Sequence, residues 1–207
     1  MTPSKIQEPT NARSRRTRAA VLAAAHAILK EEGFEALTMT AVAKRAGVTR
    51  VAVYMHFASR AKLVEGLFDY VAGVEGLAAS LQAVWDAPDA VAALDRWAAH
   101  LARYHPRVLA VDRALQRVWR DDPDAAAHRR RVVSEKLANC RRLARRLDDE
   151  GRLAGGWTVQ SATDMLFALI SSDMIEALTV DRRWSRDRLA EHLALLFQST
   201  FVSGGAG

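Results

Sequence analysis

The chain has 207 residues, half of them hydrophobic, and carries 30 Lys and Arg against 24 Asp and Glu, a formal net charge of +6. This length allows one ordinary domain, or a small domain docked onto a larger one. The single cysteine excludes an intrachain disulfide, and the sequence shows neither an N-terminal apolar stretch nor an apolar run of about 18 residues, so we expect a cytoplasmic protein with no membrane partner.

The basic excess is confined to the N-terminal part of the chain. Residues 1–62 hold 11 Lys and Arg against 4 Asp and Glu, a net charge of +7, whereas residues 63–207 hold 19 against 20. A local excess of this kind is expected of a module that binds a polyanion. A solvated basic surface is the alternative, and charge alone does not decide between them.

The N-terminus predicts a mobile arm followed by a helix. Residues 1–12 are mostly polar and include two prolines, which disfavours a packed structure. Arginines follow, among them Arg15 and Arg16, which either begin a solvated helix or neutralise DNA phosphates. From Ser14 to Gly33, apolar residues recur at three- and four-residue spacing, which predicts the first helix.

Residues 37–63, LTMTAVAKRAGVTRVAVYMHFASRAKL, predict a helix-turn-helix. A short amphipathic run over residues 40–46 is followed by a break at Gly47 and a second run that Thr49 opens. Two short helices that cross at a steep angle need small residues at the turn. The side chains left pointing away from this small core, and so available to a DNA major groove, are Thr49, Arg50, Tyr54 and His56.

Ser59 is the predicted N-cap of another helix, which we expect to reach Leu77. Arg60 and Lys62 fall in its first turn, where the helix dipole disfavours cations. We therefore hypothesise that an anion lies nearby, and that Arg60 grips a DNA phosphate.

The rest of the chain predicts helices, and the fold class is all-α because no alternating strand pattern of useful length occurs. The predicted helices cover residues 90–104, 106–119, 125–150, 159–179 and 185–201. The expected organisation is a mobile arm (1–12), a helix-turn-helix DNA-binding domain (13–58), a helical effector-binding and dimerisation domain (59–203) and a flexible tail (204–207).

Over residues 15–68 the chain resembles the tetracycline-repressor (TetR) family of bacterial transcription regulators. The first helix is rich in alanine and ends at Gly33-Phe34, and Gly47 with the following Val-Thr, Tyr54 and the His56-Phe57 pair match the family's motif. The resemblance implies a homodimer that binds a palindromic operator and usually releases it when a small effector binds the C-terminal domain. The family's DNA contacts would fall on Thr38, Thr40, Thr49, Arg50, Val51, Tyr54, His56 and Arg60.

Three of these positions differ in the DNA contacts that they can make. Arg50 can reach a guanine edge with two donors or contact a phosphate, and both interpretations stand. Val51, where the family often has Gly, cannot donate a hydrogen bond and could make only an apolar contact, for example to a thymine methyl. Arg60 stands where the family often has Lys, which keeps the charge.

Two further groups of residues are candidates for the C-terminal functions. Large side chains with polar neighbours suit an apolar effector cavity between helices, although core packing explains each one alone: Trp97, His100, Leu101, Tyr104, Trp119 and Phe167. The last two helices carry an apolar face that would form a four-helix bundle with a second copy: Leu166, Ile170, Leu189, Leu193, Leu196 and Phe197.

The remaining candidates have two interpretations each. The arginines at 129–131, 141, 142, 145 and 146 form the solvated face of a helix or, as a minority interpretation, a surface for an acidic ligand or for DNA. Cys140 is a buried small residue or a thiol sensor activated by its arginine neighbours.

The sequence contains no phosphate-cradling glycine loop, no HExxH and no cysteine pair at metal spacing, so we predict no cofactor, no metal and no enzyme activity. Three hypotheses follow: a repressor released by a small effector, a DNA-binding regulator without an effector, and an enzyme with a basic N-terminal domain.

Overall fold

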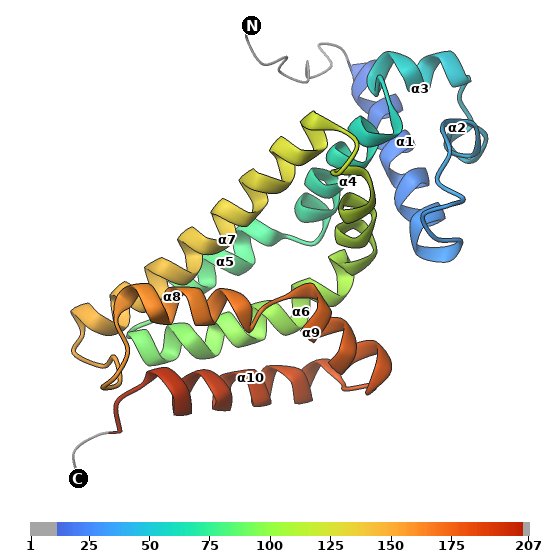
Figure 1. Ribbon diagram of the computed structural model, residues 1–207. Helices are drawn as coiled ribbons and strands as arrows, with labels where there is room; N and C mark the ends of the chain where they lie inside the picture. Colours follow the sequence, from blue (N-terminus) through green and yellow to red (C-terminus); the bar gives the residue numbers. More distant parts are fainter. Residues whose placement is uncertain (1–11, 205–207) are drawn as a thin grey trace, which may run out of the picture. The chain divides into compact units, whose positions relative to one another are not determined.

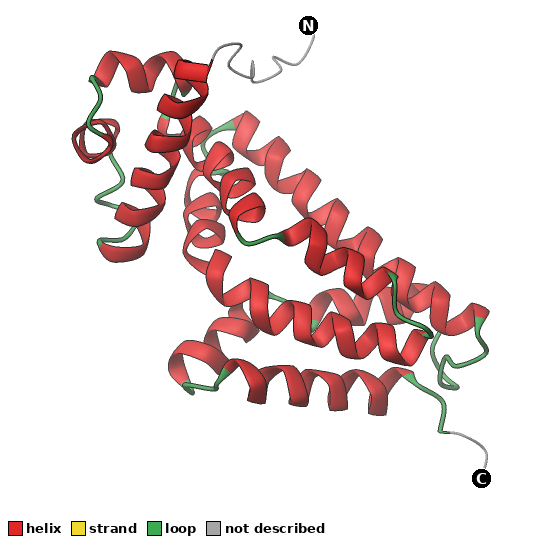
Figure 2. Ribbon diagram, turned by 180° about the vertical axis from the view of Figure 1, so that it is seen from behind, coloured by secondary structure: helices red, strands yellow, loops and turns green. Residues whose placement is uncertain are grey.

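The computed structural model describes residues 12–204, apart from the side chain of Asp124, and most of this range is helical (Figure 2). The extended pairing within it is a single isolated bridge between Leu153 and Val202. The all-α prediction is therefore confirmed. The predicted arm and tail lie outside the described residues, except for Ala12 and Gly204.

The described chain divides into two compact units, which do not follow chain order. Unit 1 contains the residues up to Val71 together with Ala110–Ala126. Unit 2 contains Ala72–Leu109 and the residues from Ala127 onward. Three helices, α4, α6 and α7, contribute residues to both units.

Unit 1 is built on helices α1 (Ala12–Glu31), α2 (Met39–Ala46) and α3 (Arg50–His56), which pack against one another, and on most of α4 (Arg60–Val74) (Figure 1). The predicted stripe of α1 is buried: Val21, Leu22, Ala25, Ile28 and Leu29. Helix α4 contacts Phe57 through Gly66, where an added Cβ would lie 2.7 Å from Phe57 Cε1. Only glycine allows this close approach.

Two predicted helix boundaries, one near Gly76 and one at Pro106, are wrong. The helix expected to reach Leu77 ends at Val74, since Gly76 adopts a left-handed conformation (φ 65°) and α5 (Leu77–Trp85) begins after it. Conversely, α6 (Ala90–Val118) runs through Pro106, which we expected to separate two helices. Proline removes one helical hydrogen bond. Buried Tyr104, His105 and Val108 hold the helix together on both sides of it.

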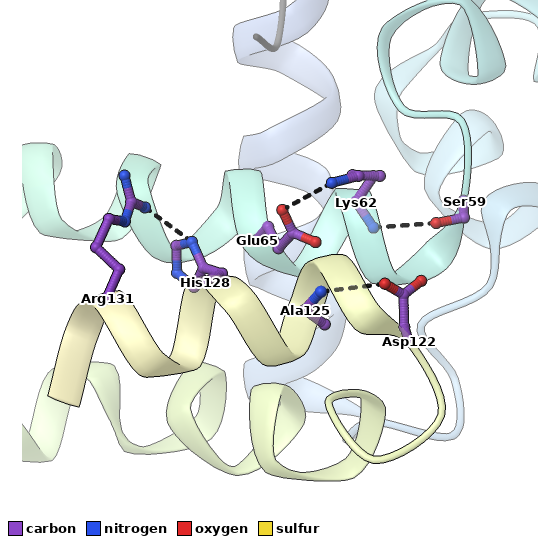
Figure 3. Close-up of polar contacts among 7 residues, drawn as sticks. All are labelled: Ser59, Lys62, Glu65, Asp122, Ala125, His128 and Arg131. Atoms are coloured by element: carbon purple, nitrogen blue, oxygen red, sulfur yellow. Dashed lines mark hydrogen bonds and ion pairs between the residues drawn. The ribbon is translucent and has the colours of Figure 1, made fainter. Parts of the chain in front are cut away.

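The last third of the chain forms α7 (Pro123–Asp149), α8 (Val159–Ala168), α9 (Ser172–Glu176), the π-helical turn η1 (Ala177–Asp181) and α10 (Arg186–Phe201). Asp122 begins α7 by accepting a 3.0 Å hydrogen bond from the Ala125 amide (Figure 3). The single helix predicted over 159–179 is wrong. Ser171 accepts a hydrogen bond from the Met174 amide and starts a new helix there.

Helices α5 to α10 enclose the core of unit 2, whose largest buried side chains include Trp97, Leu101, Leu143, Leu166, Phe197 and Phe201. None of the helices between residues 12 and 204 combines the length and apolar character that crossing a bilayer requires.

Candidate nucleic-acid interface

Helices α2 and α3 are bounded by capping residues that the sequence supplies at the expected places. Thr38 accepts a 3.1 Å hydrogen bond from the Ala41 amide, and Thr49 accepts one of the same length from the Ala52 amide. Between them Gly47 ends α2 in a left-handed conformation (φ 66°), and its N–H bonds to Ala43 and Lys44 carbonyls. These caps fix the turn and leave α3 with one buried residue, Val53.

The outer face of α3 carries large side chains that the fold does not bury. Met55 is 82% exposed, Val51 is 70% exposed and Tyr54 is 42% exposed. Val51 and Met55 are four residues apart and therefore share one side of the helix. The sequence analysis missed Met55, although this spacing from Val51 could have revealed it. Exposed apolar groups beside hydrogen-bonding ones are what reading thymine methyls and base edges requires.

Arg50 lies on the same face and is held by Tyr54. Its guanidinium donates a 3.3 Å hydrogen bond to the Tyr54 hydroxyl, and its guanidinium carbon lies 5.4 Å from the ring centroid. This exposed pair keeps the guanidinium extended along α3 and accessible. The arrangement leaves both earlier interpretations of Arg50, base edge or phosphate, available.

The other residues predicted to contact DNA lie around this face. Thr38, Thr40 and Thr49 are exposed at the helix starts, and Arg15 and Arg16 are exposed near the beginning of α1. His56 is half-buried at the end of α3, and burial, together with the positive charge of Arg18, lowers its pKa. A neutral imidazole fits a packing or phosphate-contacting group better than a permanent cation.

Arg60 is directed into unit 1 in this structure. Its guanidinium donates a hydrogen bond to the carbonyl of Phe34 and lies 3.7 Å from the centroid of the Phe34 ring. Burial lowers the pKa of Arg60. Lys62, the other cation of that turn, pairs with the buried carboxylate of Glu65 at 3.2 Å, while the Ser59 hydroxyl caps the helix as predicted (Figure 3). Both cations therefore have partners within the protein, and a phosphate is not needed to explain them.

The loop between α1 and α2 also contacts Arg117, near the end of α6. Arg117 forms a 2.9 Å ion pair with Glu35, and its guanidinium carbon lies 5.4 Å from the Phe34 ring. Phe34 and Glu35 thus connect the helix-turn-helix to α4 and to the end of α6. Sequence reasoning missed this contact, since 82 residues separate Arg117 from Glu35.

Three of the residues predicted for an effector site form a row of rings on α6. Trp97 stacks on His100 with centroids 5.2 Å apart, and His100 stacks on Tyr104 at 5.5 Å. The Ser80 hydroxyl and His100 Nδ1 are 2.8 Å apart. Burial, aided by the charge of Arg103, lowers the pKa of His100 to about 4, and burial also lowers the pKa of neighbouring His105. This ring row is therefore uncharged at neutral pH, although its nitrogens remain polar.

The other predicted effector residues are distributed differently. Leu101 is buried in the same core, Phe167 packs against that core and is partly exposed, and Trp119 belongs to unit 1. Cys140 is fully buried, and burial raises its pKa to about 12, which favours the packing interpretation over a reactive thiol.

The residues predicted to form a dimer are mostly covered by the chain itself. Five of them are buried in the core of unit 2: Leu166, Ile170, Leu189, Leu193 and Phe197. Leu196 is 38% exposed, and Leu195 beside it is 58% exposed. The sequence shows that these helices have apolar faces, but the main one is buried in the core of unit 2. Any partner surface must therefore use the exposed side.

An α2–turn–α3 unit with this outer face defines a helix-turn-helix DNA-binding protein. Residues 21–67 match the family model described as bacterial regulatory proteins, tetR family. Over these residues the chain is similar to the TetR family of bacterial regulatory proteins.

Solved structures of other proteins share this fold. NalD, the secondary repressor of the MexAB-OprM multidrug efflux pump in Pseudomonas aeruginosa, is 26% identical, with 91% of this chain and 98% of that chain covered and a TM-score of 0.66. A transcriptional regulator from Saccharomonospora viridis in complex with choline is 16% identical, with coverages of 90% and 98% and a TM-score of 0.75. The SmeT–triclosan complex is 21% identical, with coverages of 91% and 93% and a TM-score of 0.68. The search of curated proteins found no match.

Proposed function

We propose that the protein is a homodimeric repressor that binds a palindromic operator through α3 and releases it when a small, largely apolar effector binds its helical C-terminal part. The observation that carries the proposal is the outer face of α3, where Arg50, Val51, Tyr54 and Met55 are exposed around a single buried residue. In this proposal residues 13–58 read the DNA, and residues 59–203 bind the effector and the second copy.

The contacts with DNA divide by chemistry. Arg50 reads a base edge or a phosphate, and Val51 and Met55 contact thymine methyls. Tyr54 and the threonines at the helix starts, together with His56, Arg15 and Arg16, contact the backbone and set the register. Arg60 contributes by holding the α1–α2 loop, and a direct phosphate contact would require it to leave Phe34. A protein that reads DNA in this way works in the bacterial cytoplasm.

The ring row on α6 supports an effector site. Trp97 is only 2% exposed, and within residues 12–204 its Nε1 has no hydrogen-bond acceptor. A buried donor without an acceptor is costly, and an effector with an acceptor atom would remove that cost. Choline and triclosan, bound by two proteins of similar fold, are small molecules of the size such a site takes.

Helix α6 offers a physical connection between the two functions. It is continuous from Ala90 to Val118, carries the ring row in its first half and ends with Arg117 on the α1–α2 loop. A shift or rotation of α6 on effector binding would therefore act on Phe34 and Glu35, just before the N-cap of α2. The exposed Arg117–Glu35 pair contributes little stability, so its role here is positional.

The second copy would bind on the exposed side of the last helices. Met165 on α8 and Leu195 and Leu196 on α10 are 42%, 58% and 38% exposed. A two-fold dimer places its recognition helices about 34–36 Å apart, or a multiple of that, on successive major grooves.

The test is selection of bound duplexes from a random DNA pool, followed by a screen of small apolar ligands against the selected duplex. The proposal expects a palindromic sequence with half-sites spaced by whole helical turns and a ligand that weakens the complex. A palindrome that no ligand affects would instead support a regulator without an effector. Selection that yields no common sequence would refute the DNA-reading role.

A further inference from the structure

The arginines of α7 form one wall of a surface groove in unit 2. The groove has a volume of about 740 Å³ and lies between α7 and α8. Its α7 wall holds four guanidinium groups and one carboxylate, and its α8 wall holds Gln160, Thr163 and Asp164. Leu137 and Ala138 add apolar surface. The volume is within the range of small-molecule sites, and cations outnumber anions in it by two to one.

Two of the four arginines are held by the protein and supply charge from a fixed position. The Arg142 guanidinium carbon lies 4.1 Å from the Trp85 ring centroid. Arg146 forms a 2.9 Å ion pair with Glu150 and donates a 2.7 Å hydrogen bond to the Ala87 carbonyl.

The other two arginines, Arg141 and Arg145, have guanidinium N–H groups that could still donate hydrogen bonds to a ligand. Arg141 makes one long hydrogen bond, 3.3 Å, across the groove to Gln160 Oε1. Arg145 makes no hydrogen bond and no ion pair with any residue between 12 and 204, although it lines the groove. The two are four residues apart on α7 and therefore lie one turn apart on the same face. A pair of guanidinium forks at this spacing matches the oxygens of a carboxylate or phosphate.

The acidic residues of the groove do not satisfy these arginines. Asp164 accepts hydrogen bonds of 2.9 and 3.0 Å from Gln160 Nε2, which turns the Gln160 oxygen toward Arg141. Asp149 lines the groove but forms no ion pair with Arg145, even though it is four residues further along α7. The groove therefore keeps a net positive charge beside an apolar wall.

We propose that the α7–α8 groove binds a small organic anion, with Arg141 and Arg145 holding a carboxylate or phosphate head group and the Leu137 wall covering an apolar body. The site uses no residue of the ring row on α6, and it does not depend on the DNA-reading role. It gives a function to the arginines that otherwise form only a solvated helix face.

The experiment measures binding of 8-anilinonaphthalene-1-sulfonate, a fluorescent anion with an apolar body, to the full-length protein. R145A and R141A remove groove cations, and R130A, an exposed arginine of α7 outside the groove, is the matched control. We expect about tenfold weaker binding for R145A and for R141A, as for loss of charge-assisted hydrogen bonds, and unchanged binding for R130A. Circular dichroism checks that each variant is folded, and Arg145 has no hydrogen bond or ion pair with residues 12–204 whose loss could unfold the chain.

Competition identifies the head group and the need for an apolar body. A naphthalene carboxylate and a naphthyl phosphate should both displace the probe from the wild type, and inorganic phosphate alone should do so only at much higher concentration. The proposal is overturned if the probe binds R145A and R141A as tightly as the wild type. It is also overturned if the substitutions change the mass of the particle in solution but not anion affinity, which would make the groove an interface between copies.

Discussion

Replacement of His100 by Asn should reduce the loss of stability that the protein suffers in acid. The pKa of His100 is lowered from 6.5 to about 4, chiefly by burial, so the unfolded chain binds a proton more tightly than the folded one. The stabilisation is complete above pH 6.5 and is lost as the pH falls through the folded pKa. One pKa unit corresponds to about 1.4 kcal/mol, so His100 alone should lower the free energy of unfolding by about 2–3 kcal/mol between pH 7.5 and 4.5.

The assay is urea denaturation followed by circular dichroism at pH 7.5 and 4.5, at one protein concentration. H100N should lose about 2–3 kcal/mol less than the wild type between the two pH values, whatever its stability at pH 7.5. His105 remains in this variant and keeps part of the acid sensitivity, because burial lowers its pKa as well. A99N, an exposed change on the same helix, is the control for introducing Asn. Equal losses in H100N and wild type would refute the inference that His100 is held neutral.

Two further substitutions test the packing and the proposed dimer. G66A places a methyl group 2.7 Å from Phe57 Cε1 and should cost about 1–3 kcal/mol of stability, measured by urea denaturation; G73A, with nothing within 4 Å of the added Cβ, is its control on the same helix. L195E places a charge on the exposed side of α10 and should give a folded monomer by light scattering, whereas a dimer of unchanged mass would exclude this side as the interface.

The helix-turn-helix could be predicted because its signals are local. Gly47 and Thr49 act within a few residues of the turn, and the structure shows Gly47 ending α2 and Thr49 capping the start of α3. The apolar stripe of α1 was predictable for the same reason, since a helical period needs no knowledge of the partner.

Local sequence signals are least informative where tertiary contacts outweigh local preference. Pro106 does not end α6, because buried residues on both sides hold the helix. The face of α8 and α10 that looked suited to a partner is covered by the chain's own core, and periodicity cannot say which of two layers will cover an apolar face. The cations at the start of α4 suggested a nearby anion, but in the structure the Arg60 guanidinium contacts the carbonyl and the ring of Phe34 in the α1–α2 loop.

Part of the predicted effector site could be grouped from the sequence, because helical spacing alone places its residues on one face. Trp97, His100 and Tyr104 are three or four residues apart and fall on one face of α6, so their grouping follows from the helical period. Trp119 lies further along the same helix but in the other compact unit, a division that no sequence signal marks.

The central claim, that the outer face of α3 reads DNA, is tested most directly by the affinity of R50A for the duplex selected from the random pool. Fluorescence anisotropy at several salt concentrations gives the dissociation constant and its salt slope. The account predicts about tenfold or greater loss of affinity for R50A, with R130A close to the wild type. If R50A bound the selected duplex with wild-type affinity and an unchanged salt slope, Arg50 would contact neither base nor phosphate, and the assignment of α3 as the reading helix would be contradicted.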